Sequence, residues 1–147
     1  MTSAEVLRRV ADAPIARLAT VRDTGAPHIV PVVFAYAAAG VDESADPAIV
    51  TAVDHKPKRT HDLARLRAIA HEPRVSVLVD HYDEDWDRLW WIRVDGHARI
   101  VDGEAAETAR DLLCDKYSQY DDARPEGPAV AVTALTWRWW SADDSLG

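Results

Sequence analysis

The residue types best suited to bind a charged ligand gather at residues 54–62, which read DHKPKRTHD. The protein is acidic, with a net charge of −8, yet two of its three lysines, Lys56 and Lys58, stand here beside Arg59. Ammonium and guanidinium groups form strong charge-assisted hydrogen bonds, and an arginine can hold a phosphate through two of them. The segment therefore predicts a phosphate site in an otherwise anionic molecule.

The elements expected on either side of this segment suit that chemistry. A strand is predicted over residues 48–53 and a helix over residues 60–71, with Thr60 able to cap the helix. Free N–H groups and the positive dipole end at a helix start favour an anion, and Thr51 adds a hydroxyl at the strand end. The alternative is a solvated charge cluster paired with neighbouring acids, which is common on protein surfaces. No glycine-rich phosphate loop decides between the two.

Composition limits the classes of protein to which the chain can belong. Its 147 residues suit a single domain, residues 1–147, that can bury a core without disulfides. The negative charge argues against nucleic acid or a membrane surface as partner, because both are polyanions. The single cysteine, Cys114, cannot form an internal disulfide, and neither a signal-like segment nor a membrane-length apolar run is seen. We therefore expect a cytoplasmic protein.

The apolar pattern predicts a mainly β protein with peripheral helices. Besides the helix at 60–71, helices are expected from Thr2 or Ser3 to before Pro14 and over residues 104–117. Strands that are mostly consecutive and linked by hairpins indicate a small antiparallel barrel. The six expected strands cover residues 15–22, 28–36, 48–53, 75–80, 89–101 and 129–140.

Details of these elements yield three further expectations. Pro31 lacks an N–H, so it should sit at a bulge or where no partner strand needs that donor. Gly96 interrupts a strand face, which indicates a bulge or a close backbone approach. In the helix at 60–71, Leu66 falls on the apolar stripe, while Arg65 and Arg67 are predicted to face water.

Four segments in this order resemble a known superfamily: RLATVRDTGAPHIVPVVFAY, IVTAVDHKPKRTHDLARL, EPRVSVLVDHY and LWWIRVDGHARIVDG. The chain resembles the flavin- and deazaflavin-dependent split-barrel oxidoreductases, which include pyridoxamine-phosphate oxidase. Within them it is most similar to an actinobacterial group that uses the deazaflavin coenzyme F420. The resemblance spans about residues 10–140. It implies a six-stranded FMN-binding split barrel and a homodimer with the cofactor in grooves at the interface.

The resemblance also implies which residues hold the cofactor. Its phosphate end would lie on a threonine at a strand end and on basic residues before a helix, and another strand would run beside the ring. The matching residues are Thr51, Lys56, Lys58, Arg59 and Thr60 at the phosphate end and Pro31, Val32 and Val33 at the ring. Trp91, opposite the core face of its strand, is an aromatic candidate for the groove wall or the dimer contact.

The chain departs from pyridoxamine-phosphate oxidase near its C-terminus, where TWRWW replaces the arginine–histidine signature that reads pyridoxine phosphate. This argues against vitamin B6 oxidation. The hypothesis is an oxidoreductase that transfers a hydride between coenzyme F420 and a small-molecule acceptor, with FMN as the alternative cofactor. The rival is a non-catalytic protein that binds or senses a flavin or haem. Because the cofactor carries the hydride chemistry, no catalytic side chain is named, and no histidine spacing predicts a metal site.

Overall fold

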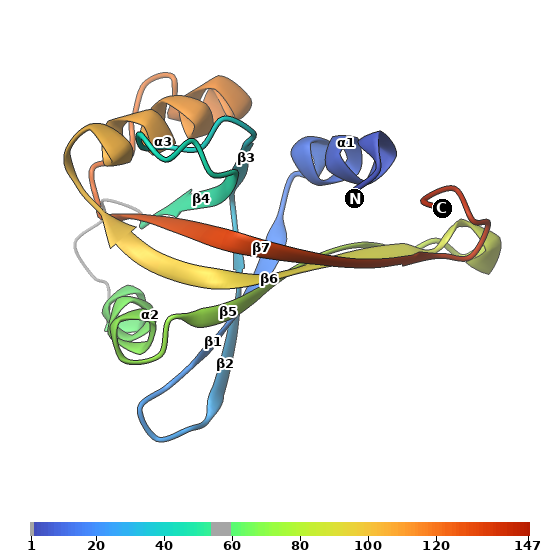
Figure 1. Cartoon of the computed structure of the whole chain (residues 1–147), viewed down its shortest axis with the longest axis horizontal. Coiled ribbons are helices and arrows are strands. Elements are labelled where there is room, and N and C mark those ends of the chain that lie inside the picture. The colour runs from blue at the N-terminus through green and yellow to red at the C-terminus, as the bar shows by residue number, and fades with distance from the viewer. Residues whose placement is uncertain (1, 54–59) are drawn as a thin grey trace.

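The structure, a computed structural model, describes residues 2–53 and 60–147. One seven-stranded antiparallel sheet carries three α-helices and two short 3₁₀ helices (Figure 1). The helices are α1 (Ala4–Asp12), α2 (Thr60–His71), α3 (Gly103–Lys116), η1 (Trp86–Arg88) and η2 (Ser118–Tyr120). The strands are β1 (Ala16–Val21), β2 (Pro27–Val32), β3 (Ala35–Ala37), β4 (Ala48–Ala52), β5 (Arg74–His81), β6 (Trp90–Val101) and β7 (Ala129–Ser141). None of the helices in these two ranges is long and apolar enough to cross a membrane.

The sheet is curled into a half-barrel. Its strand order is β2-β1-β5-β6-β7-β4-β3, so β2 and β3 form opposite edges although they follow each other in the chain. Only Val33 and Phe34 separate them, and so short a connection requires the two edges to approach each other. The core cluster inside the curl includes Leu18, Phe34, Val77, Ile92, Val94 and Val130.

The prediction of six strands was wrong, because the strand expected over residues 28–36 is divided into β2 and β3. The cause is a side chain from far along the sequence. The Tyr117 hydroxyl accepts a hydrogen bond from the Phe34 N–H at 3.1 Å and lies 3.1 Å from the Phe34 carbonyl and 2.9 Å from the Pro14 carbonyl. Both backbone groups of Phe34 therefore meet a phenol in place of a neighbouring strand.

We expect Tyr117→Phe to lower the free energy of unfolding by about 1–2 kcal/mol, because the buried polar groups around Phe34 lose their partner. The Phe34 backbone groups that contact the hydroxyl are partly buried, so water replaces it only in part. Urea unfolding of the two proteins measures the difference. Equal midpoints would mean that the hydroxyl does not hold this junction.

A lysine also packs on this junction. The Lys116 ammonium lies 3.9 Å from the centre of the Phe34 ring, and its Nζ is buried without a hydrogen-bond partner among the described residues. Burial lowers the pKa of Lys116 to about 8, and the negative charge of Asp12 opposes that shift. The aromatic ring also favours the charged amine, which offsets part of the cost of burying it.

This lysine should make stability depend on pH. Its folded-state pKa is lowered, so its contribution is fully present above the ordinary lysine pKa of about 10.4 and is lost as the pH falls toward about 8. We expect the parent to melt at a higher temperature at pH 9.5 than at pH 7.5, and Lys116→Met to reduce that difference. Thermal melts at both values measure it; an unchanged difference would contradict the role of Lys116.

The two strand irregularities expected from the sequence have structural counterparts. β2 is an edge strand that pairs only with β1, with Pro31 opposite Arg17, so Pro31 lies on a strand where a missing donor is tolerated. Gly96 lies opposite a bulge in β7. Asp95 pairs with Thr136 and His97 pairs with Thr133, so two residues of β7 lie opposite the single residue Gly96 of β6. The prediction for Gly96 is confirmed, and the position of Pro31 on an edge strand is compatible with the prediction made for it.

Helix α2 has the predicted bounds, but its exposed face differs from the expectation. Ala68 and Ile69 are buried, and Arg67 is exposed as predicted. Arg65, which was predicted to face water, is partly buried and lies at a pocket beside the ends of β2 and β4. A charged side chain is therefore placed at a pocket, where it can contact a ligand.

Candidate functional site

A pocket of about 290 Å³ lies where the ends of β2 and β4 meet α2 and η2. It is lined by Pro31, Val32, Val33, Thr51, Ala52, Arg65 and Tyr120. Four of the expected cofactor residues thus share one pocket: Pro31 and Val32 at the end of β2, Val33 directly after it, and Thr51 on β4. The curl of the sheet produces this proximity, because it brings the edge strand β2 toward β4.

Thr51 is held firmly in this pocket. β4 is buried along its whole length, and Thr51 is only 4% exposed. Its Oγ1 donates a hydrogen bond to the Val33 carbonyl at 2.8 Å, which ties the end of β4 to the connection between β2 and β3. The one hydroxyl proton is therefore engaged, and donors for an anion must come mainly from other groups.

Arg65 supplies such donors, and sequence reasoning missed it. It lies on α2 about one and a half turns from Thr60, the first helical residue. The basic segment directly precedes Thr60 in the sequence. The available signal was this nearness of a further arginine to Lys58 and Arg59. A partly buried guanidinium presents several donors in a fixed plane, which suits a phosphate or carboxylate.

Three of the expected phosphate residues, Lys56, Lys58 and Arg59, lie outside the described residues. Thr60 is the first residue of α2. On the other side, the Val53 N–H donates to the Pro128 carbonyl at 2.9 Å, which fixes the chain at the end of β4. The basic segment thus joins the two elements that carry Thr51 and Arg65.

Trp91 lies at the far end of the sheet from this pocket. Thr51 pairs with Val130 on β7, whereas Trp91 pairs with Trp140, ten residues further along β7. At about 3.3 Å per residue, roughly 30 Å of strand separates the two positions. Within one chain, Trp91 and the Thr51 pocket therefore cannot contact the same cofactor ring.

Comparison with known proteins identifies the fold. A family model described as Pyridoxamine 5'-phosphate oxidase matches residues 2–142. The chain belongs to the pyridoxamine 5'-phosphate oxidase family. The curled antiparallel sheet agrees with the split-barrel fold of that family.

Solved structures share this fold at low sequence identity. A conserved hypothetical protein of Mycobacterium tuberculosis aligns at 22% identity and a TM-score of 0.72, covering 97% of this chain and 86% of that chain. The heme storage protein HutZ of Vibrio cholerae aligns at 15% identity and 0.68, covering 95% and 94%. A FAD-binding protein of Mesorhizobium loti aligns at 20% identity and 0.60, covering 96% of each chain. No curated protein matches the sequence.

The pocket of this family member fits only part of a flavin-like cofactor. Its volume of about 290 Å³ lies below the range of roughly 300–1,000 Å³ that encloses most small-molecule ligands. Arg65 and the apolar walls formed by Pro31, Val32 and Val33 suit a phosphate and the chain attached to it. A planar tricyclic ring must extend beyond these walls.

Proposed function

We propose that the protein is an oxidoreductase that binds the phosphate end of coenzyme F420 in the Thr51 pocket and transfers a hydride between that coenzyme and a small organic acceptor. The observation that carries the proposal is the convergence of Pro31, Val32, Val33 and Thr51 on one pocket with Arg65. The basic segment between β4 and α2 adds the positive charge that an anionic cofactor needs. Family membership supports a flavin-like ligand, and the resemblance of the sequence to the deazaflavin group favours F420 over FMN.

The side chains of this chain bind and orient, and the cofactor supplies the hydride when it is bound. Arg65 and the basic segment neutralise the phosphate, and the Thr51 hydroxyl keeps the loop at Val33 in place. The strand end at Pro31 provides one apolar wall for the start of the ring system. The acceptor would take the accompanying proton from solvent, because no side chain of the chain is assigned as a proton donor.

The proposed assembly is a homodimer, because the pocket of one chain leaves the cofactor ring without a second wall. We expect light scattering at micromolar concentration to give twice the chain mass of 16.3 kDa. Exposed apolar side chains on another part of the surface also favour a contact: Ile15 is 41% exposed and Ile29 62% exposed. A stable monomer of 16.3 kDa would remove the shared groove from the proposal.

Separate titrations with F420, FMN and haem test the choice of ligand. We expect F420 to bind most tightly and its reduced form to be oxidised when a suitable acceptor is added. Tighter binding of FMN would change the cofactor. Tight binding of haem, with no turnover of reduced F420 or FMN, would favour the alternative of a non-catalytic binding or storage protein.

A further inference from the structure

A second pocket, of about 450 Å³, lies on the outer face of the sheet near the β5–β6 connection. Aromatic side chains from neighbouring strands form much of its wall. Its lining includes Leu78, Asp80, Tyr82, Trp91, Arg93 and Trp140. We call it the tryptophan pocket.

Two tryptophans form an aromatic row across this pocket. Trp91 on β6 lies directly opposite Trp140 on β7, and opposite Asp80 on β5. Cross-strand neighbours point to the same face of a sheet, so the two indoles offer adjacent π surfaces. The one carboxylate in the row, Asp80, is neutralised by Arg17, whose Nη1 lies 2.8 Å from it. The row therefore suits a planar ring and presents no unpaired charge to it.

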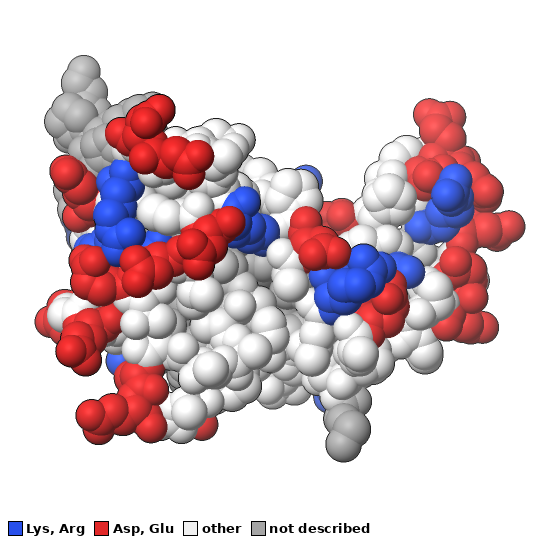
Figure 2. All heavy atoms as spheres, turned by 90° about the horizontal axis from the view of Figure 1, so that it is seen from above, with Lys and Arg blue, Asp and Glu red and all other residues white. Residues whose placement is uncertain are grey.

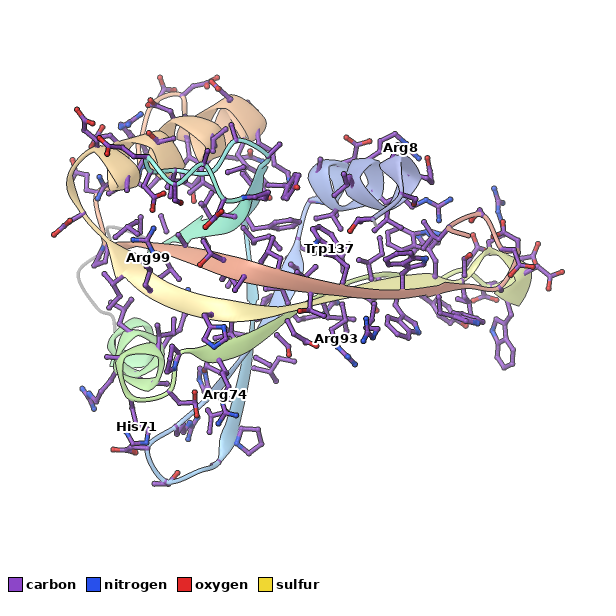
Figure 3. The ribbon with its side chains drawn as sticks, in the orientation of Figure 1. Arg8, His71, Arg74, Arg93, Arg99 and Trp137 are labelled. Atoms are coloured by element: carbon purple, nitrogen blue, oxygen red, sulfur yellow. The ribbon has the colours of Figure 1, made fainter. Side chains whose placement is uncertain are left out.

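The next row on the same face carries two guanidinium groups. Arg93 on β6 lies opposite Arg138 on β7, two residues from the tryptophans. Figure 3 shows Arg93 on the side of the sheet away from α1, whereas Trp137 lies on the α1 side. Like charges at opposed positions destabilise a sheet. Among the described residues, this pair forms one ion pair, between Arg93 Nε and Asp95 Oδ1 at 3.1 Å. Arg138 donates to the Trp137 carbonyl and forms no ion pair among the described residues. The row therefore favours an added anion.

The charges beyond the tryptophans have the opposite sign. The β5–β6 connection carries Asp83, Glu84, Asp85 and Asp87, and acidic side chains gather at this end of the molecule (Figure 2, right-hand end). A ligand that lies on the tryptophans thus meets acids on one side and guanidinium groups on the other. An anionic group on the ligand is directed toward the arginines.

We propose that the tryptophan pocket binds a planar aromatic carboxylate, with its ring on Trp91 and Trp140 and its carboxylate on Arg93, which lines the pocket, and on Arg138, which lies opposite Arg93 just outside the lining. The two rows are two residues apart, about 7 Å along the strands, which an arginine side chain can span. This binding does not depend on the proposed function, so it is testable without cofactor.

Calorimetry with three matched probes on the full chain tests this inference: 1-naphthoate, 1-naphthalenemethanol and 1-naphthylmethylammonium. We expect naphthoate to bind at least tenfold more tightly than the alcohol, and the ammonium to bind most weakly. Arg93→Gln combined with Arg138→Gln should reduce naphthoate affinity to that of the alcohol and leave the alcohol unaffected. Trp140→Ala should weaken both ligands tenfold or more.

Trp86→Ala is the matched control, because Trp86 is 69% exposed and does not line the pocket. It should bind naphthoate as the parent does, and thermal melts should show every variant folded. Equal affinity of the parent for naphthoate and the alcohol would overturn the inference. Unchanged naphthoate binding by the double arginine variant would also overturn it, because the carboxylate would then contact neither Arg93 nor Arg138. Failure of F420 binding with these results intact would reject the proposed function alone.

Discussion

Arg65→Gln should weaken binding of the phosphate end of the cofactor about 10- to 100-fold, since a charge-assisted hydrogen bond contributes about 1.5–3 kcal/mol. Glutamine is shorter, keeps a polar amide at the end of the side chain, and removes the charge and the planar fork of donors. Arg65 lies on the same pocket as Thr51, so the loss should appear for any ligand whose phosphate enters that pocket. Calorimetric titration with F420, and with FMN, measures it, and the effect should shrink as salt rises.

Arg67→Gln provides the matched control, because Arg67 lies two residues along α2 and is exposed. It removes the same charge from the same helix outside the pocket, so only a small change in affinity is expected. Equal losses in the two variants would indicate long-range attraction and no phosphate contact at Arg65. Lys58→Ala combined with Arg59→Ala tests the basic segment separately, and the sequence predicts a loss of similar size for each charge removed.

Much of the fold follows from local sequence signals. The bounds of α2 were predictable because Thr60 and Pro73 mark its two ends, and the bulge near Gly96 was predictable because a glycine within a strand weakens pairing there. The break between β2 and β3 was not. It depends on the Tyr117 hydroxyl, which is 83 residues from Phe34 in the sequence, and no pattern within residues 28–36 reveals that partner.

The candidate site shows the same division between local and distant causes. Thr51 and the strand at Pro31 could be assigned from the resemblance, and the structure brings them to one pocket. Arg65 could not be assigned to the pocket from the sequence. Helical periodicity indicates on which face of the helix a side chain lies, but it does not show which strand ends pack beside that face. The separation of Trp91 from Thr51 was also hidden, since it depends on the pairing of both strands with β7.

Gly96→Ala should lower the free energy of unfolding by about 3 kcal/mol, at the upper end of the usual cost of forcing extra atoms into a packed interior. A Cβ at this position would lie 2.6 Å from the Thr133 carbonyl oxygen and 2.7 Å from Val132 Cγ1. The oxygen belongs to the backbone of β7, so the contact is relieved only if the strand moves. Urea unfolding followed by circular dichroism measures the loss.

Ala134→Gly is the control at the same bulge. Ala134 has a φ of 55°, a conformation in which an alanine is strained and a glycine is not, so this variant should keep or slightly raise the stability. The bulge also sets the direction of β7 between its buried first half and the half that carries Trp137 and Trp140. If Gly96 permits that bend, Gly96→Ala should shift the tryptophan fluorescence of the native state and lower the unfolding midpoint. Ala134→Gly should leave the fluorescence unchanged and should not lower the midpoint. A Gly96→Ala protein with the parent's midpoint and spectrum would mean that β7 accommodates the methyl group and that the close approach does not direct the strand.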